Sequence, residues 1–245
     1  MDAIVLAGGR GTRLAEAVDD LPKSLAPVNG RPFLDYLLVE LASSGLIHTV
    51  VLALGYLADS VIEHYRNVAP PIPLRFALEA QPLGTAGALR NALPFTSSDV
   101  VVAYNGDTLV HVDLRSLLEL RAKWQSPAAL AIARADDRSR YASVRLKGEF
   151  VTGFAEKTSG GPGLVNAGVY ALSRGLFDVF PSGPLSMELD VLPQLASRGQ
   201  LVALEISGPL LDIGLPDTYV SAGEFVSHFF EPSAWHRANI ASAPQ

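Results

Sequence analysis

The sequence predicts an α/β fold, a Rossmann-like three-layer sandwich whose central mixed sheet is mostly parallel and covered by helices on both faces. Two observations predict it. Short apolar runs with β-branched residues, typical of strands buried on both faces, alternate with segments whose apolar residues recur at helical spacing. This alternation is that of repeated βαβ units, whose ligand sites lie beyond the carboxyl ends of the strands.

The first half of the chain carries the alternation most clearly. The apolar runs expected to form parallel strands are residues 3–7, 49–54, 74–78 and 100–104. The helices expected between them are residues 33–44, 58–66 and 85–92. The strand at 3–7 ends at two glycines, so a turn follows it directly.

After about residue 127 the pattern changes to shorter strand-like pieces. These are residues 128–134, 143–146, 151–155 and 165–172. We interpret residues 127–175 as a mixed extension of the sheet on the substrate side. The chain is therefore interpreted as one domain over residues 1–230, and the Pro-, Ser- and Ala-rich residues 231–245 as a poorly ordered tail.

Composition excludes several classes of function. The net charge is −6 and no cluster of Lys and Arg is present, which argues against nucleic acid as a partner. The absence of cysteine excludes disulfides, thiolate catalysis and Cys-ligated metals. No signal peptide or membrane-length apolar run is present, so we expect a cytoplasmic enzyme with no membrane partner. The sequence leaves open whether the protein forms a homo-oligomer.

A glycine-rich loop follows the first strand. Its glycines let backbone N–H groups approach an anion closely, and its arginine suits phosphate oxygens. A tight turn would explain one or two of the glycines but not the neighbouring Thr12 and Arg13. The loop lacks the Walker A ending, and Leu14 stands where a dinucleotide fingerprint has its third glycine. The residues predicted to bind nucleotide here are Leu6, Ala7, Gly8, Gly9, Gly11, Thr12 and Arg13.

A second short motif, Pro22-Lys23-Ser24-Leu25, stands about ten residues after the loop. The pattern G-G-x-G-T-R-L followed by this motif resembles the signature of the sugar-1-phosphate nucleotidyltransferase family. The resemblance implies a fold of the nucleotide-diphospho-sugar transferase type, in which Arg13 and Lys23 hold the triphosphate and the incoming phosphate as catalytic cations. Taken alone, Lys23 would be an ordinary exposed lysine after a proline.

Residues 79–88 also resemble a family element, the segment that recognises the base. Its glycines let backbone groups contact a base edge, and Glu79 or Gln81 could reach ring N–H groups. The alternative is an ordinary loop that enters a helix. The residues carried over to nucleotide binding are Glu79, Gln81, Pro82, Gly84 and Thr85.

Two aspartates are predicted to hold magnesium. Asp107 follows the strand 100–104, where an open α/β sheet places its active site, and Asn105 and Gly106 join the nucleotide-binding set. Asp212 stands among apolar residues, where an unpaired carboxylate is costly. Two carboxylates, completed by waters and phosphates, suit Mg²⁺. Either aspartate alone could be a helix cap or a turn residue, and Asp113 is expected to be a cap.

Two further elements match the family's sugar site. The resemblance implies that Glu156 receives sugar hydroxyls, Lys157 receives the sugar phosphate, and Asn166 with Gly168 lines the sugar pocket. A surface ion pair and a turn are the alternatives. Glu188 is left out of this set, because a helix N-terminus favours acids in any case.

The resulting hypothesis is transfer of a nucleotidyl group from a nucleoside triphosphate to a sugar 1-phosphate, with release of pyrophosphate. Residues 20–28, 31–34, 81–87 and 212–216 most resemble D-glycero-α-D-manno-heptose 1-phosphate guanylyltransferases, compact bacterial enzymes that use GTP to make GDP-heptose for capsule or other surface polysaccharide. The alternatives are a mannose-1-phosphate guanylyltransferase, a uridylyl- or thymidylyl-transferring relative, and a silent subunit that binds nucleotide-sugars. A dinucleotide-dependent oxidoreductase is disfavoured by Leu14. Gln81, where many relatives have Glu, leaves the base open.

Overall fold

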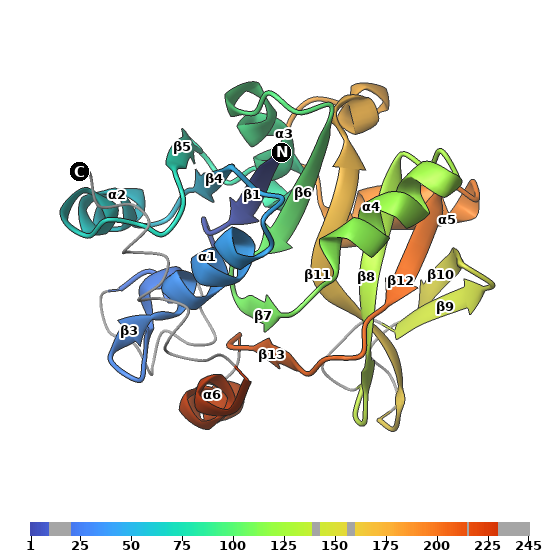
Figure 1. The fold of residues 1–245 in the computed structure, drawn as a ribbon. Helices are drawn as coiled ribbons and strands as arrows, with labels where there is room; N and C mark the ends of the chain where they lie inside the picture. The colour runs from blue at the N-terminus through green and yellow to red at the C-terminus, as the bar shows by residue number, and fades with distance from the viewer. Residues whose placement is uncertain (10–20, 139–142, 156–159, 215, 230–245) are drawn as a thin grey trace.

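The computed structural model describes residues 1–9, 21–138, 143–155, 160–214 and 216–229 (Figure 1). A nine-stranded sheet crosses the molecule in the order β5-β4-β1-β6-β11-β8-β12-β10-β9. Its strands are β1 (Asp2–Leu6), β4 (Thr49–Leu54), β5 (Leu74–Leu78), β6 (Val100–Asn105), β8 (Ala128–Ala135), β9 (Ser143–Lys147), β10 (Phe150–Ala155), β11 (Gly163–Ser173) and β12 (Leu201–Glu205). The helices of the described residues are α1 (Phe33–Ser43), α2 (Ala58–Asn67), α3 (Gly84–Ala92), α4 (Leu114–Lys123), α5 (Leu192–Ser197) and α6 (Pro216–Phe229), with short helical turns at Lys23–Leu25, Leu93–Phe95, Arg174–Val179 and Met187–Val191.

The sheet is mixed in the way the sequence predicts. β5, β4, β1 and β6 pair in parallel, and β8 pairs in parallel with β12. β11 is inserted between β6 and β8 and runs antiparallel to both. β10 likewise runs antiparallel to β12 and β9. The strands after residue 127 therefore continue the same sheet as the parallel strands before it.

Two apolar cores lie on the two faces of the sheet. Along β1, Ala3 and Val5 belong to one core and Ile4 to the other, because successive side chains of a strand point to opposite faces. Apolar residues of α1, α2, α4 and α6 complete the first core, and those of α3 and α5 complete the second. Figure 1 shows α1 and α4 in front of the sheet, with α3 and α5 behind it. This confirms the predicted three layers.

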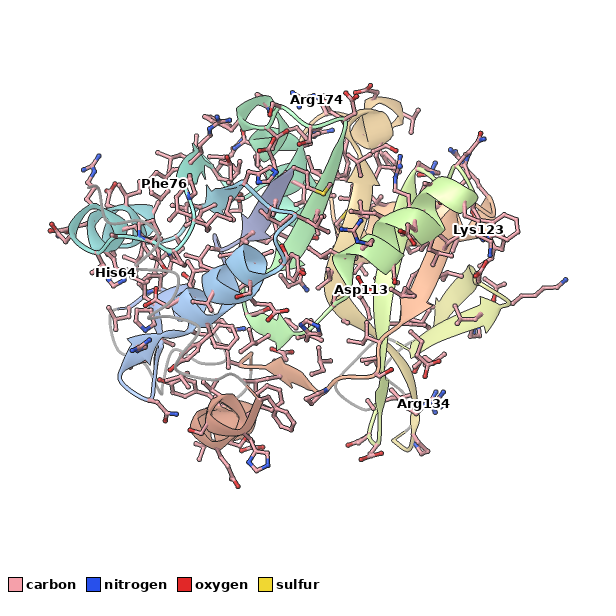
Figure 2. All side chains as sticks on the ribbon, viewed as in Figure 1. His64, Phe76, Asp113, Lys123, Arg134 and Arg174 are labelled. Atoms are coloured by element: carbon pink, nitrogen blue, oxygen red, sulfur yellow. The ribbon has the colours of Figure 1, made fainter. Side chains whose placement is uncertain are left out.

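The elements expected from the apolar pattern agree with the structure to within two residues at each end. Asp113 caps α4, as expected: its carboxylate accepts hydrogen bonds from the backbone N–H groups of Arg115 and Ser116 at 3.0 and 3.2 Å (Figure 2). The predicted tail, 231–245, lies outside the described residues. None of the described helices is both long and apolar enough to cross a membrane.

Two small two-stranded sheets stand beside the carboxyl ends of β1 and β6. They are β2 (Pro27–Val28) with β3 (Arg31–Pro32), and β7 (Thr108–Val110) with β13 (Leu210–Asp212). Two hydrogen bonds connect α6 to the β2–β3 sheet. The Asn29 side chain donates to the Gly223 carbonyl at 2.8 Å, and the Tyr219 hydroxyl donates to the Pro27 carbonyl at 2.7 Å. The segment after Lys23 and the segment after Asp212 are thereby held together.

Candidate active site

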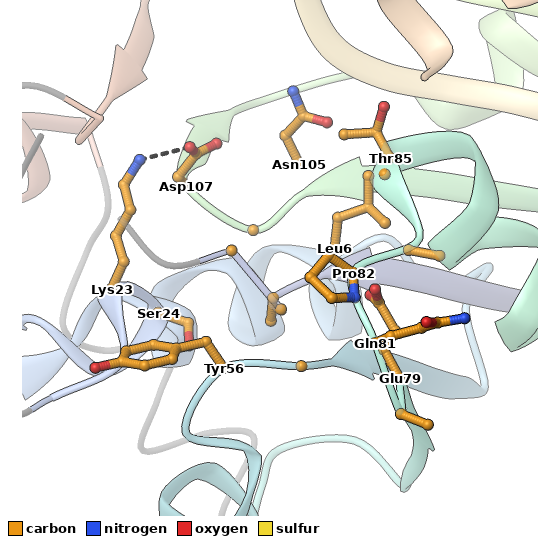
Figure 3. Close-up of a pocket in the computed structure, with 18 residues that line it drawn as sticks. Leu6, Lys23, Ser24, Tyr56, Glu79, Gln81, Pro82, Thr85, Asn105 and Asp107 are labelled. Carbon is orange, nitrogen blue, oxygen red and sulfur yellow. Dashed lines mark hydrogen bonds and ion pairs between the residues drawn. The ribbon is translucent and has the colours of Figure 1, made fainter. Parts of the chain in front are cut away.

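A pocket of about 560 Å³ opens where the parallel strands β1, β4, β5 and β6 end (Figure 3). This is the edge at which an α/β sheet binds its ligands. Five segments line it, and four of them were predicted to contribute to a nucleotide site. Their predicted members in the lining are Leu6, Ala7, Gly8 and Gly9; Lys23; Glu79, Gln81, Pro82, Gly84 and Thr85; and Asn105, Gly106 and Asp107. Gly11, Thr12 and Arg13 lie outside the described residues.

Backbone hydrogen bonds join the strand ends that form the pocket floor. The Gly106 N–H donates to the Leu6 carbonyl at 2.9 Å, which connects β6 to β1. The Tyr56 N–H donates to the Gly8 carbonyl at 3.1 Å, which connects the glycine loop to the residues after β4. The start of the glycine loop is thus held by two neighbouring strands before any ligand binds.

The predicted base-recognition loop is held from both ends. The Glu79 carboxylate accepts a hydrogen bond from the Leu83 N–H at 3.0 Å, within the loop. The Thr85 hydroxyl donates to the Glu188 carboxylate at 2.7 Å. The Leu185 carbonyl accepts from the first N–H groups of α3, at 2.9 Å from Ala86 and 3.0 Å from Gly87. The segment 185–188 therefore determines where this wall of the pocket stands.

Lys23 and Asp107 form an ion pair at the pocket mouth. Nζ of Lys23 lies 2.5 Å from Oδ2 of Asp107. The Lys23 side chain is only 12% exposed, whereas that of Asp107 is 38% exposed. A pair with one partner this open to water adds about 1 kcal/mol or less to stability. The position of the Lys23–Asp107 pair suits a role in ligand binding better than a role in stability, because the pair holds the lysine ammonium group at the pocket, where it can meet an anionic ligand.

Asp212 meets the same pair from the neighbouring strand. In the β7–β13 ladder Asp212 is the register partner of Thr108, and the Ile213 N–H donates to the Asp107 carbonyl at 3.0 Å. A Cβ atom placed on Gly214 would stand 2.7 Å from Oδ1 of Asp212 and 3.0 Å from Nζ of Lys23. Asp107, Asp212 and Lys23 therefore converge on one point, although the sequence separates them widely.

The carboxylates of Asp107 and Asp212 both lie near Nζ of Lys23. Within the described part of the chain, no group of three or more His, Cys, Asp and Glu side chains is arranged to hold a metal. Two carboxylates at a pocket mouth form a hard-oxygen donor set whose remaining positions are open to water and phosphate oxygens. This donor set fits Mg²⁺ and does not fit a metal that requires a complete cage of protein ligands.

Two of the residues predicted to form the sugar site, Asn166 and Gly168, lie on β11, the strand next to β6. Asn166 and Gly168 occupy an irregularity in β11 and are not part of the pocket lining, but Gly168 packs against the side chain of Asn105. Burial raises the pKa of the Tyr170 hydroxyl, and the nearby carboxylates of Glu188 and Asp107 raise it further. This hydroxyl therefore stays protonated. Glu156 and Lys157 lie outside the described residues.

Some residues of the site were missed from the sequence. The pocket is also lined by Ser24, Gly55, Tyr56, Ala80 and Ala88. Gly55 and Tyr56 could have been found, because they directly follow the predicted strand 49–54 and strand ends converge at this edge. Glu188, which we attributed to the preference of helix starts for acids, contacts the pocket-lining Thr85.

Comparisons with known proteins give one consistent result. A family model described as nucleotidyl transferase matches residues 2–228. The chain is 34% identical over 230 residues to a D-glycero-alpha-D-manno-heptose 1-phosphate guanylyltransferase of Aneurinibacillus thermoaerophilus, covering 94% of this chain and 100% of that protein. It is 31% identical over 239 residues to a mannose-1-phosphate guanylyltransferase of Mycobacterium tuberculosis, covering 95% of this chain and 66% of that protein. The crystal structure of HddC from Yersinia pseudotuberculosis complexed with GMP-PN is similar with a TM-score of 0.82 and 33% identity, covering 91% of this chain and 98% of that chain.

Proposed function

The chain belongs to the nucleotidyl transferase family, and from this premise we propose that it transfers GMP from GTP to D-glycero-α-D-manno-heptose 1-phosphate, forming GDP-heptose and pyrophosphate. One observation carries the choice of substrates. The similarity to the Aneurinibacillus heptose 1-phosphate guanylyltransferase extends over 94% of this chain and 100% of that protein. GDP-heptose made in this way would supply a surface polysaccharide such as a capsule.

The reaction is in-line attack of a phosphate oxygen of the sugar 1-phosphate on the α-phosphorus of GTP. A new oxygen–phosphorus bond forms there, while the bond from the α-phosphorus to the bridging oxygen breaks and pyrophosphate leaves with the electron pair. The attacking phosphate has a second pKa of about 6 and is mostly ionised at neutral pH, so no general base is required. The chain has to provide position and positive charge.

Lys23 is the described residue best placed to provide that charge. When the triphosphate binds, the Lys23 ammonium group would exchange its ion pair with Asp107 for contacts with phosphate oxygens. Because the Lys23 side chain is only 12% exposed, little water would screen the attraction between lysine and phosphate. Arg13, in the glycine-rich loop, would add a second cation; the support for this role is the resemblance of the loop sequence to the family motif. By the same resemblance to the family, Glu156 would bind sugar hydroxyls and Lys157 would bind the sugar phosphate. Asp107 and Asp212 would hold Mg²⁺, which neutralises phosphate charge when it is bound.

The base is assigned to the loop after β5. The Glu79 carboxylate already accepts a hydrogen bond from the Leu83 N–H at 3.0 Å, whereas Gln81 is exposed at the pocket rim. An amide side chain offers both a donor and an acceptor, which matches the carbonyl and N–H groups on the edge of guanine. We therefore propose that Gln81 recognises guanine and that Glu79 maintains the conformation of the loop.

A mannose-1-phosphate guanylyltransferase is the second candidate. The 31% identity to the Mycobacterium tuberculosis enzyme favours it, but this chain covers only 66% of that protein. Both candidates share GTP and differ in the sugar. A silent nucleotide-sugar-binding subunit is disfavoured because Lys23, Asp107 and Asp212 are all present and converge.

The test is pyrophosphate release measured with each of GTP, ATP, UTP and dTTP crossed with heptose, mannose and glucose 1-phosphates. The proposal predicts the highest kcat/KM for GTP with the heptose substrate. Turnover with UTP or dTTP alone would refute the guanylyl assignment, and a preference for mannose 1-phosphate would favour the second candidate.

A further inference from the structure

The Thr85 hydroxyl, in the first turn of α3, is fully engaged by the segment 185–188. It donates its hydrogen to Oε2 of Glu188 at 2.7 Å. Its oxygen accepts a hydrogen bond from the Met187 N–H at 2.8 Å. Thr85 lines the pocket (Figure 3), but a hydroxyl group whose only hydrogen is donated to the protein has none left for a nucleotide. The polar group of Thr85 therefore binds within the protein.

The local structure around Glu188 brings its carboxylate to this hydroxyl. Met187–Val191 forms a π-helix, a rare widening of the helical turn that is frequent at functional sites. The Ser186 hydroxyl begins this helix, because it accepts a hydrogen bond from the Leu189 N–H at 3.1 Å. The same hydroxyl donates to Oε2 of Glu188 at 3.1 Å. One carboxylate oxygen thus accepts hydrogen bonds from two hydroxyl groups, one on each side of the contact between α3 and the π-helix.

The backbone of the same segment supports the start of α3. Leu83, at the N-cap position, has no polar side chain with which to cap the helix. The Leu185 carbonyl takes that role, since it accepts from the N–H groups of Ala86 and Gly87 at 2.9 and 3.0 Å. The Leu185 N–H donates in turn to the Leu83 carbonyl at 2.8 Å. The first turn of α3 therefore depends for its position on a segment about one hundred residues later in the chain.

The Glu188 carboxylate is the charged part of this attachment. Hydrogen bonds to an ionised acceptor are stronger than bonds between neutral groups, so the contact with Thr85 should contribute more than each backbone contact. Glu188 itself is not part of the pocket lining, whereas Gly84, Thr85 and Ala88 are. A shift of the first turn of α3 would therefore move the pocket wall, and small displacements of a wall that positions a ligand are costly.

We propose that Glu188 is a positioning residue for nucleotide binding: it holds the Thr85 hydroxyl and thereby fixes the base-side wall of the pocket. The proposal rests on the nucleotidyl transfer proposed above, because it concerns the nucleotide of the same pocket. It changes the role of Thr85 from a nucleotide contact to a connection within the protein. Loss of the connection should weaken nucleotide binding and base selectivity more than kcat, because Lys23 and Asp107 come from other segments.

Single variants test the two ends of the contact. Thr85→Val keeps the shape of threonine and removes the hydroxyl, and Glu188→Ala removes the carboxylate. Each is expected to raise the KM for GTP by about 10-fold, to change kcat by less than about 3-fold, and to lower the preference for GTP over ATP in kcat/KM. Thr85→Ser keeps a donor and Glu188→Gln keeps an acceptor, so both are expected to restore most of the wild-type KM and selectivity.

The double variant decides what the Thr85 hydroxyl contacts. If it serves only Glu188, Thr85→Val combined with Glu188→Ala should raise the KM about as much as either change alone. If the hydroxyl contacted the nucleotide directly, the two effects would multiply, and the proposal would be overturned. Ser116→Ala is the matched control. It removes a hydroxyl that donates to the Asp113 carboxylate at 2.6 Å at the start of α4, outside the pocket lining, so the KM for GTP should not change.

The outcomes separate this proposal from the proposed function. The kinetics use the triphosphate and sugar phosphate that turn over best, so a wrong base or sugar does not affect the comparison. If no pair turns over, nucleotidyl transfer is wrong, and calorimetric Kd values for the four triphosphates replace the KM values. Urea unfolding shows whether each variant is folded, and Thr85→Val carries the test if Glu188→Ala is not. Wild-type affinity and selectivity in folded Thr85→Val would overturn the proposal, and a wild-type protein that binds no nucleotide would overturn both.

Discussion

Gly84, the first residue of α3, is the position where one added methyl group is expected to disturb the pocket most directly. It has a left-handed backbone with φ +71° and belongs to the pocket lining. A Cβ atom on this residue would stand 2.7 Å from the Leu185 carbonyl oxygen. That oxygen is not free to move, because it accepts hydrogen bonds from Ala86 and Gly87 at 2.9 and 3.0 Å.

The cost of Gly84→Ala has two parts. A left-handed conformation costs an L-residue about 1–2 kcal/mol relative to glycine. Overpacking against a fixed backbone atom costs about another 1–3 kcal/mol. The free energy of unfolding is therefore expected to fall by about 2–5 kcal/mol. The start of α3 should also shift away from Leu185, which displaces the loop assigned to the base and raises the KM for GTP.

Gly45→Ala is the matched control for this experiment. Gly45 also has a left-handed backbone, with φ +65°, but nothing lies within 4 Å of an added Cβ atom and it is not part of the pocket lining. Its substitution should therefore cost only the conformational part, about 1–2 kcal/mol, and leave the KM for GTP unchanged. Urea unfolding and steady-state kinetics of both variants give the comparison.

Equal losses of unfolding free energy in the two variants would contradict the close contact between Gly84 and Leu185. An unchanged KM for GTP in Gly84→Ala would show that the start of α3 does not position the base loop.

Three further substitutions test separate parts of the site. Asp107→Asn is expected to lower kcat with Mg²⁺ by at least about 100-fold, and near-normal kinetics would remove this carboxylate from the metal site. Lys23→Met is expected to lower kcat by about 100- to 1,000-fold while unfolding changes by about 1 kcal/mol or less, because its ion-pair partner is 38% exposed; a large loss of stability would instead show a structural role. For Asp35→Asn the expectation is a pH dependence. Burial raises the pKa of the Asp35 carboxyl, so the folded protein binds this proton more tightly than the unfolded chain, and the resulting stability is lost as pH rises through the raised pKa. Asparagine keeps an acceptor for the Tyr65 hydroxyl but does not titrate, so the variant does not lose stability in this way. In urea unfolding, the free energy of unfolding of Asp35→Asn minus that of the wild type should therefore increase from about pH 4 to pH 7. A difference that stays constant over this range would contradict the assignment.

Strands buried on both faces could be located from the sequence because their apolar runs are local signals. The run at 49–54 matches β4 in full. The strand β12, over Leu201–Glu205, was missed, and so were β7 and β13, which have three residues each. β7 and β13 pair with each other, and such short strands are stabilised by a partner that lies far away in the sequence.

The chemistry of the site could be predicted further than its geometry. Lys23, Asp107 and Asp212 were predicted to act together, and the structure places Lys23 and Asp212 beside Gly214 and pairs Lys23 with Asp107. Their convergence depends on the pairing of β7 with β13, which no local pattern specifies. Asn166 was assigned to the sugar from a motif, but a motif does not show that a side chain folds back on its own strand, as this one does at Gly168.

The most direct test of nucleotidyl transfer follows the label of GTP during turnover with D-glycero-α-D-manno-heptose 1-phosphate. With GTP labelled at the α-phosphorus, the account predicts that the label appears in a nucleotide-sugar with the mass of GDP-heptose. With GTP labelled at the γ-phosphorus, it predicts that the label appears in pyrophosphate. Appearance of the γ label in a sugar phosphate or in inorganic phosphate, with the α label left in GDP, would contradict it.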